Sequence, residues 1–286
     1  MKRSTTTSTT RRAVLRPNVI GDGGRRRRIL VTLGAILALA LLAGGTWGYL
    51  RLRDLWLEQC VIDDFAAQVT VNGGKMVKPD VIAEEFGLRK GANAALIDFD
   101  TRRREILAKI PNLRDLKVTR QLPNRVTVVV EEREPFVKMN VRGGKTVTGR
   151  VADKEGVVFV CYRNTQALPT IRETGTPTPP GKRLSQRGMA ALAVAEACAD
   201  PALQEVQFLE CDISKPNYLL LVLSDYSRVR LAWDGMDAPS SRSAAALRSQ
   251  LDAFASVYKS DLGHGTRTWD ATIPNQISAL DPGGIQ

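Results

Sequence analysis

Metal-ligating side chains are scarce in this chain of 286 residues, which has one histidine, His264, and four cysteines. The cysteines are Cys60, Cys161, Cys198 and Cys211, and no two of them form a CxxC pair. Structural zinc sites cluster Cys and His at short spacings. The sequence therefore predicts no metal site and no cofactor. Cys198 and Cys211 could pair in an oxidising compartment, or all four could be buried as small apolar side chains.

Excess positive charge is missing from most of the chain. Residues 1–28 contain nine Lys or Arg and one Asp, which leaves +3 of the formal net charge of +11 for the rest. Nucleic-acid binding needs a clustered basic face on the folded part, so we expect no nucleic-acid partner. The segment 1–28 is rich in Ser, Thr, Arg and Gly and has no apolar period, which predicts a disordered cytoplasmic tail.

Charged residues are absent from Ile29 to Leu50. As a helix, residues 29–50 would span about 33 Å, enough for a hydrocarbon core of about 30 Å. Trp47 and Tyr49 lie at the end where aromatic rings favour the membrane interface. A cleaved signal sequence has a shorter apolar region, and a buried core helix of this length is rare in a small domain. We therefore expect a transmembrane helix.

The basic residues before this helix indicate its orientation. Only Arg51 and Arg53 follow it closely, and Asp54 and Glu58 offset them. The positive-inside rule then places the N-terminus in the cytoplasm and the folded part outside the inner membrane, in the periplasm. Residues 51–64 are expected to form a juxtamembrane linker.

Residues 65–134 predict a small α+β domain with the order β-α-α-β-β. A short strand at 68–71 precedes a helix that begins at Pro79 and stops at Gly87. A second helix begins near Asp100, as its cap, and ends before proline 111. Two alternating strands around a Pro-Asn turn then form an antiparallel hairpin, and both helices cover one face of a three-stranded sheet.

Five short motifs occur in and around this predicted domain. They are Val71-Asn72-Gly73, Ile110-Pro111, Arg120 to Asn124, Val126 to Val130, and Arg133-Glu134-Pro135. Together they resemble the POTRA domain of the FtsQ/DivIB family of bacterial cell-division proteins, in which that domain follows a single membrane span. The Arg-x-Leu-Pro-Asn motif at 120–124 is the most specific of them. One departure is Asn112, where the family often has an aromatic residue.

Residues 135–281 predict a larger β-rich domain, with helices packed on an antiparallel sheet and a short tail at 282–286. A hairpin over 150–159 turns at Gly156. Ser185 caps a helix that runs to about Ala199. Further strands are expected at 206–211, 218–223, 228–233, 267–273 and 276–280.

A second helix in this region begins at Ser240 or Ser241 and has an apolar stripe. We expect the stripe to pack on its own sheet rather than on a partner. The stripe consists of Ala244, Leu247, Leu251, Phe254 and Tyr258. The layout resembles the family up to about residue 280, but Asp270-Ala271-Thr272 lacks the arginine of the family's Asp-x-Arg.

No arrangement in the sequence predicts catalysis. His264 lies between two glycines, a poor position for a fixed general base. The carboxylates of Asp63-Asp64 and Glu131-Glu132 are adjacent, so on a strand they point to opposite faces. We therefore expect no enzyme and no small-molecule substrate. Two alternatives stay open: a membrane-anchored cell-wall hydrolase, and a POTRA-bearing secretion or envelope-assembly component.

The resemblance implies a non-catalytic divisome scaffold at the division septum, which binds the small membrane proteins FtsB and FtsL and supports septal peptidoglycan synthesis. The last strands are expected at a sheet edge, where a partner strand can add. Trp269 is either the anchor for that partner or a core residue. The expected partner-binding residues are Thr268, Trp269, Asp270, Ala271, Thr272, Gln276, Ile277, Ser278, Ala279 and Leu280.

Overall fold

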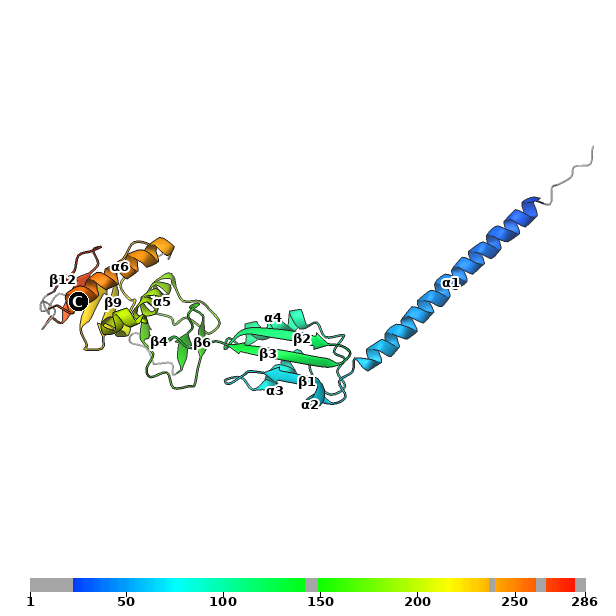
Figure 1. The fold of residues 1–286 in the computed structure, drawn as a ribbon, viewed down its shortest axis with the longest axis horizontal. Coiled ribbons are helices and arrows are strands. Elements are labelled where there is room, and N and C mark those ends of the chain that lie inside the picture. Colours follow the sequence, from blue (N-terminus) through cyan, green and yellow to red (C-terminus); the bar gives the residue numbers. More distant parts are fainter. Residues whose placement is uncertain (1–22, 142–148, 237–239, 261–265, 281–286) are drawn as a thin grey trace, which may run out of the picture. The chain divides into compact units, whose positions relative to one another are not determined.

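A computed structural model describes residues 23–141, 149–236, 240–260 and 266–280. The chain divides into two compact units, Met1–Gln59 and Cys60–Gln286. Figure 1 shows a single long helix in the first unit and two sheets, each with its own helices, in the second. The fold class is therefore α+β, as the sequence predicts. The boundary expected between residues 134 and 135 lies inside the second unit and stays a prediction.

The first unit is the helix α1, Gly23–Gln59. Its segment Arg27–Gln59 is long and apolar enough to cross a membrane, and its apolar side chains are exposed. The helix starts before the apolar run, so the prediction of a disordered segment is wrong for residues 23–28. Residues 1–22 lie outside the described part of the chain. Within this unit, α1 also continues for nine residues beyond Leu50.

The three-stranded sheet has the order β1-β3-β2. Strand β1 runs parallel to β3, and β2 pairs antiparallel with β3. The predicted β-α-α-β-β order and hairpin are confirmed, with one short helix added before the first strand. The elements are α2 Phe65–Gln68, β1 Val69–Asn72, α3 Pro79–Phe86, α4 Phe99–Lys109, β2 Leu113–Gln121 and β3 Arg125–Glu132.

Helix boundaries in this region follow from local chemistry. Pro79 occupies the first turn of α3, and Gly87 ends it with a φ of 76°, which a side chain would strain. The cap of α4 is Asp98, whose carboxylate accepts from the Thr101 amide at 3.1 Å. The prediction of Asp100 as the cap is wrong because that residue already lies inside the first turn.

One face of this sheet carries the core. Val126, Val128 and Val130 are buried, and they pack with Ile82 of α3 and Ile106 of α4 in one apolar cluster. Thr127 and Val129 point to the other face, and Val129 is 42 % exposed. The alternation read from the sequence therefore has the correct register.

The segment expected as a linker, 51–64, has a different structure. It is helical to Gln59, and Cys60 and Ile62 are then fully buried. Val61 forms an isolated antiparallel bridge with Asn93. Cys60 and Ile62 thus belong to the core of the second unit, and hydrogen bonds to the backbone of residues 91–94 hold them there.

The second sheet has nine strands in the order β12-β11-β10-β9-β8-β7-β4-β5-β6. It is mixed and not antiparallel as predicted, since β4–β7, β7–β8 and β10–β11 pair in parallel and the other neighbours antiparallel. Long connections allow parallel pairing, and alternation within a strand does not indicate its partner's direction. The strands are β4 Val137–Val141, β5 Arg150–Ala152, β6 Val158–Val160, β7 Thr170–Glu173, β8 Phe208–Asp212, β9 Leu219–Leu223, β10 Arg228–Leu231, β11 Thr268–Ala271 and β12 Ser278–Ala279.

Two α-helices and a 3-10 helix accompany this sheet (Figure 1): α5 Gln186–Cys198, η1 Pro201–Val206 and α6 Ser241–Tyr258. Ser185 and Ser240 cap α5 and α6, as predicted. Both helices contribute to one apolar cluster with the strands. The stripe of α6 packs in this core as expected, except that Ala244 is exposed.

All four cysteines are buried free thiols. Burial raises the pKa of Cys198 to about 12, and burial also raises the pKa of Cys211 well above its usual range. Their thiols are therefore protonated and act as small apolar side chains in the core.

Candidate functional site

The two outer strands of the nine-stranded sheet differ in how their free sides are occupied. We call the free side of β6 the β6 edge, and the free side of β12 the β12 edge. A strand at the end of a sheet presents one row of N–H and C=O groups that its neighbour does not use. Another strand can add only where these N–H and C=O groups have no hydrogen-bond partner within the protein.

Backbone and side-chain groups cover the β6 edge. The Val158 amide donates to the Lys182 carbonyl at 2.9 Å, and the Gly181 amide donates to the Val158 carbonyl at 2.7 Å. The side-chain amide of Asn112 donates to the Val160 carbonyl at 2.6 Å. Strand addition at this edge would have to break these bonds.

The β12 edge is formed by a short strand that pairs antiparallel with β11. Trp269 pairs with Ala279 and Asp270 with Ser278. The Leu280 amide donates back to the Thr268 carbonyl at 2.9 Å. Since successive residues alternate, the N–H and C=O of Ala279 point away from β11. Among the described residues, no strand lies beyond β12.

The buried side chain of Gln250 on α6 holds the turn between β11 and β12. Its amide nitrogen donates to the carbonyls of Ala271 and Ile273, both at 3.0 Å. Its oxygen accepts from the Asn275 amide at 2.8 Å. Gln250 is 3 % exposed, so these bonds lie in a dry environment where an unpaired backbone group is costly.

The turn also contains its own polar contacts. The Asp270 carboxylate accepts from the Thr272 amide at 2.9 Å and from the Thr272 hydroxyl at 2.6 Å. Asn275 has a φ of 59°, a left-handed conformation that asparagine tolerates better than most residues. The direction in which β12 returns along β11 is therefore fixed locally.

Trp269 is a core residue. It is 2 % exposed, and its ring lies 5.9 Å from that of Phe254 and 6.3 Å from that of Tyr258, both edge-on. These rings belong to α6, so β11 is packed against this helix. The sequence left two interpretations of Trp269, a core residue or an anchor for a partner. The structure supports the core residue, and the prediction of an anchor at this position is wrong.

The other nine expected site residues divide by exposure. Thr268 and Ala271 are buried, and Ala271 pairs with Leu231 of β10. Asp270, Thr272, Ile277 and Leu280 are partly exposed, and Gln276, Ser278 and Ala279 are exposed. Three of the ten side chains expected to bind a partner therefore face inward.

Asp225 lies in the turn between β9 and β10, near the aromatic end of α6. Burial raises the pKa of Asp225, but hydrogen bonds from Ser227 and Tyr258 outweigh it, and the pKa lies below its usual range. The Ser227 hydroxyl donates to the carboxylate at 2.6 Å. The ionised form of Asp225 thus connects the turn to α6.

The carboxylate pairs singled out in the sequence have structural contacts. Glu132 accepts from the amides of Met76 and Val77 at 2.7 and 2.9 Å, and Asp64 caps α2. Within the described segments, no group of three His, Cys, Asp or Glu side chains could hold a metal ion. His264 lies outside the described residues.

The comparisons with known proteins agree with these features. A family model described as "POTRA domain, FtsQ-type" matches residues 66–133. Similar curated proteins include cell division protein FtsQ of Streptomyces bingchenggensis, 31 % identical over 47 % of this chain and 45 % of that protein. Cell division protein DivIB of Clostridium acetobutylicum is 26 % identical over 40 % of this chain and 44 % of that protein. The alignments with these two proteins span less than half of either.

A further relative covers most of both chains. Cell division protein FtsQ of Myxococcus fulvus is 31 % identical over 232 residues, which are 79 % of this chain and 77 % of that protein. The chain belongs to the FtsQ/DivIB family.

As a member of the FtsQ/DivIB family, the chain is a cell-division protein with a POTRA domain. Among its described residues, one helix is able to cross a membrane. The match to the POTRA model covers the three-stranded sheet from α2 to the end of β3. Asn112, one of the two positions at which the sequence departs from the expected family pattern, donates to the β6 edge. No local pattern indicated that contact, since the two residues lie 48 positions apart.

Proposed function

We propose that this FtsQ/DivIB family member is a non-catalytic scaffold of the division machinery, and that it binds a partner of the FtsB/FtsL type by strand addition at the β12 edge. The binding would connect membrane-anchored division proteins and support septal peptidoglycan synthesis. The observation that carries the proposal is the contrast between the covered β6 edge and the β12 edge, where the Ala279 backbone points outward.

In strand addition, backbone hydrogen bonds supply affinity and side chains supply specificity. The outward N–H and C=O of Ala279 would bond to the incoming strand. The exposed side chain of Ser278 would contact side chains of the incoming strand on one face of the sheet. Buried Trp269 would contribute by keeping β11 in place, since a strand that shifts cannot offer a fixed register.

The proposed placement is a single-pass inner-membrane protein at the division septum, with the N-terminus in the cytoplasm and residues after the helix in the periplasm. The nine basic residues before the span support this orientation through the positive-inside rule. The test fuses, after residue 286, a reporter enzyme that works only in the cytoplasm. Activity of this reporter would contradict the proposed orientation.

The absence of catalysis is also a proposal. One member of each carboxylate pair holds the protein's own backbone: Glu132 accepts from the amides of Met76 and Val77, and Asp64 from those of Ala66 and Ala67. A zymogram on cell-wall material tests the rival wall hydrolase. A cleared band for the wild-type protein would contradict the proposal that the protein is a non-catalytic scaffold.

The decisive test of the partner edge is Ala279→Pro. Proline removes the outward donor, and edge strands tolerate it because that N–H is not part of the ladder. We expect partner capture from solubilised membranes to fall by at least about tenfold, since a lost backbone bond of ~1 kcal/mol adds to the bulk of the ring. Thermal unfolding should stay near wild type.

The matched control is Ala279→Val, which keeps the donor and favours a strand. It should capture the FtsB-like partner as wild type does. If Ala279→Pro also captures this partner at the wild-type level, the binding edge lies elsewhere in the protein.

A further inference from the structure

We propose that one end of the POTRA domain, which we call the basic rim, lies on the membrane surface and binds anionic lipid headgroups. The rim consists of Arg89, Lys90, Leu96, Leu122 and Arg125. The proposal rests on the transmembrane placement of α1 proposed above. It is independent of the β12 edge.

Backbone pairing places the rim at the start of the second unit. The Ile62 amide donates to the Ala92 carbonyl at 2.9 Å, and the Gly91 amide donates to the Ile62 carbonyl at 2.8 Å. On another side, the Asn124 side chain donates to the Val61 carbonyl at 3.5 Å. The loop at 89–96 and the β2–β3 turn therefore both flank residues 60–62, where the chain enters this unit.

Chain length limits how far this end can be from the bilayer. The apolar run ends at Leu50, and the nine helical residues after it rise by about 14 Å at most along the membrane normal. The headgroup layer occupies roughly 5–7 Å of that distance. The remaining gap of less than about 10 Å is comparable with the Debye length in physiological salt, so charges on the rim can interact with the lipid surface.

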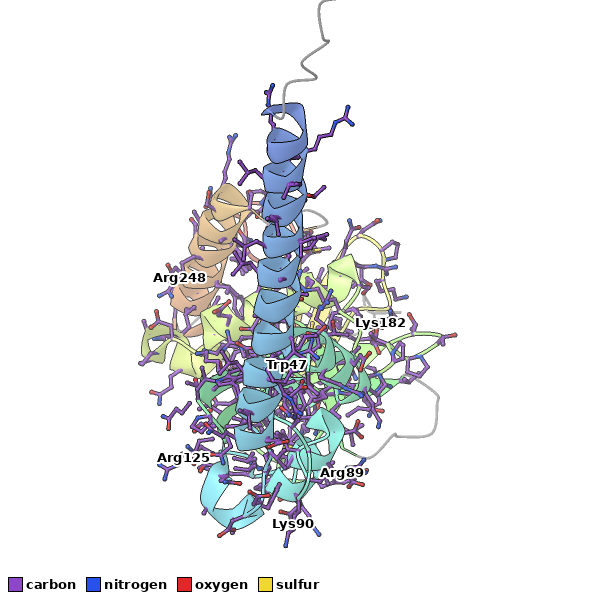
Figure 2. All side chains as sticks on the ribbon, turned by 90° about the vertical axis from the view of Figure 1, so that its right-hand side faces the viewer. Trp47, Arg89, Lys90, Arg125, Lys182 and Arg248 are labelled. Atoms are coloured by element: carbon purple, nitrogen blue, oxygen red, sulfur yellow. The ribbon has the colours of Figure 1, made fainter. Side chains whose placement is uncertain are left out.

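The basic side chains of the rim are available for such an interaction. Arg89, Lys90 and Arg125 are exposed, and none forms an ion pair with another described residue. Figure 2 shows all three at the periphery of the domain. Two acidic residues lie close in sequence to residues 60–62. Asp63 is exposed, and Asp64 is occupied with the amides of Ala66 and Ala67 at the start of α2.

Two exposed leucines favour lipid over an acidic protein segment as the occupant. Leu122 at the tip of the β2–β3 turn is 67 % exposed, and Leu96 in the other flanking loop is 71 % exposed. Leucine at a loop tip, beside Lys or Arg, can insert at the boundary between headgroups and acyl chains while the cations bind phosphates. A soluble acidic segment would pair with the cations, but its charges would offer no apolar surface to Leu96 and Leu122.

The test places an environment-sensitive fluorophore on Leu122→Cys in the full-length chain, reconstituted in lipid nanodiscs. The four native cysteines are at most 3 % exposed, so the new thiol is labelled selectively. Tyr226→Cys, at a position 72 % exposed on the β9–β10 turn, is the control. With phosphatidylglycerol in the nanodisc, emission from the labelled Leu122→Cys protein should shift to shorter wavelength, and nitroxide-labelled headgroups should quench it. The labelled Tyr226→Cys protein should show neither effect.

A second variant tests the charges. Arg89→Gln, Lys90→Gln and Arg125→Gln together should remove the dependence of the Leu122→Cys signal on phosphatidylglycerol. Equal emission in phosphatidylcholine and phosphatidylglycerol nanodiscs overturns the proposal. So does a shift that needs an added division protein, which would make the occupant a protein. Carbonate extraction separates failure of the lipid contact from failure of the transmembrane placement on which it rests. A chain that carbonate extracts has no transmembrane anchor.

Discussion

The two edges of the nine-stranded sheet show how one protein protects one strand and leaves another accessible. At the β6 edge, the segment around Lys182 and the Asn112 side chain occupy the groups that face outward. At the β12 edge, the structure supports the strand only from behind, through Gln250 and the packing of Trp269. Supporting a strand from behind fixes its position without using its outward donors.

This difference bears on the risk of unwanted pairing. An open, long and flat edge strand invites association with any extended chain. The β12 edge is short, and only Ser278 and Ala279 are assigned to the strand. A short edge limits non-specific addition, so a partner would need a second contact to bind tightly.

Among variants that test the difference between the two edges, Gln250→Ala is expected to have the largest effect on stability and partner capture. The substitution removes the Gln250 partner of the Ala271 carbonyl and the Asn275 amide, while the Ile273 carbonyl keeps the Gln276 amide at 3.1 Å. It should lower the free energy of unfolding by about 3 kcal/mol. Partner capture should fall with it, because β12 loses its support. Chemical denaturation and co-purification measure the two effects.

A matched control lies on the same helix. Ser249 is exposed, so Ser249→Ala should change stability by no more than about 0.5 kcal/mol. Wild-type stability of Gln250→Ala would show that the turn is held in another way.

A smaller effect is expected at the opposite edge from Asn112→Ala. Loss of the bond to the Val160 carbonyl should cost about 1 kcal/mol, measured by thermal unfolding. Capture of the FtsB-like partner should not change, because the β12 edge is untouched. If Asn112→Ala reduced capture as much as Ala279→Pro does, the two edges would not be functionally different.

The smallest effect concerns pH. The pKa of Asp225 is lowered in the folded state by hydrogen bonds from Ser227 and Tyr258, which outweigh burial. The folded state therefore binds fewer protons than the unfolded state near pH 4. The contribution of Asp225 to stability is complete above the unfolded pKa of about 3.9, and it is lost as the pH falls through the folded value.

Asp225→Asn should accordingly flatten the acid limb of a plot of Tm against pH and leave its neutral part less changed. Tyr258→Phe removes one donor and should give an intermediate curve. An unchanged acid limb for both variants would mean that this carboxylate does not couple α6 to the β9–β10 turn.

Much of the POTRA domain was predictable because its signals are local. Alternation over 126–130, Pro79 at the start of a helix and Gly87 after its end each act through neighbouring residues. The cap of α4 was misplaced by two positions, since Asp98 and Asp100 are chemically alike and only the start of the helix separates them. The expected linker was wrong because the burial of Cys60 and Ile62 depends on distant partners at 91–94.

By itself, the sequence determined a helix able to cross a membrane, the POTRA motifs, and two strands at the end of the chain. These depend on composition, periodicity and turn residues, all of which are readable within a short window. The expected position of the last strand at a sheet edge is confirmed. Only the tertiary structure decided that Asn112 and Lys182 cover the opposite edge, and that Trp269 faces the core. Periodicity fixes which face of a strand is apolar, but the order of strands in a sheet and the partner of each buried polar group are set by contacts between residues far apart in the chain.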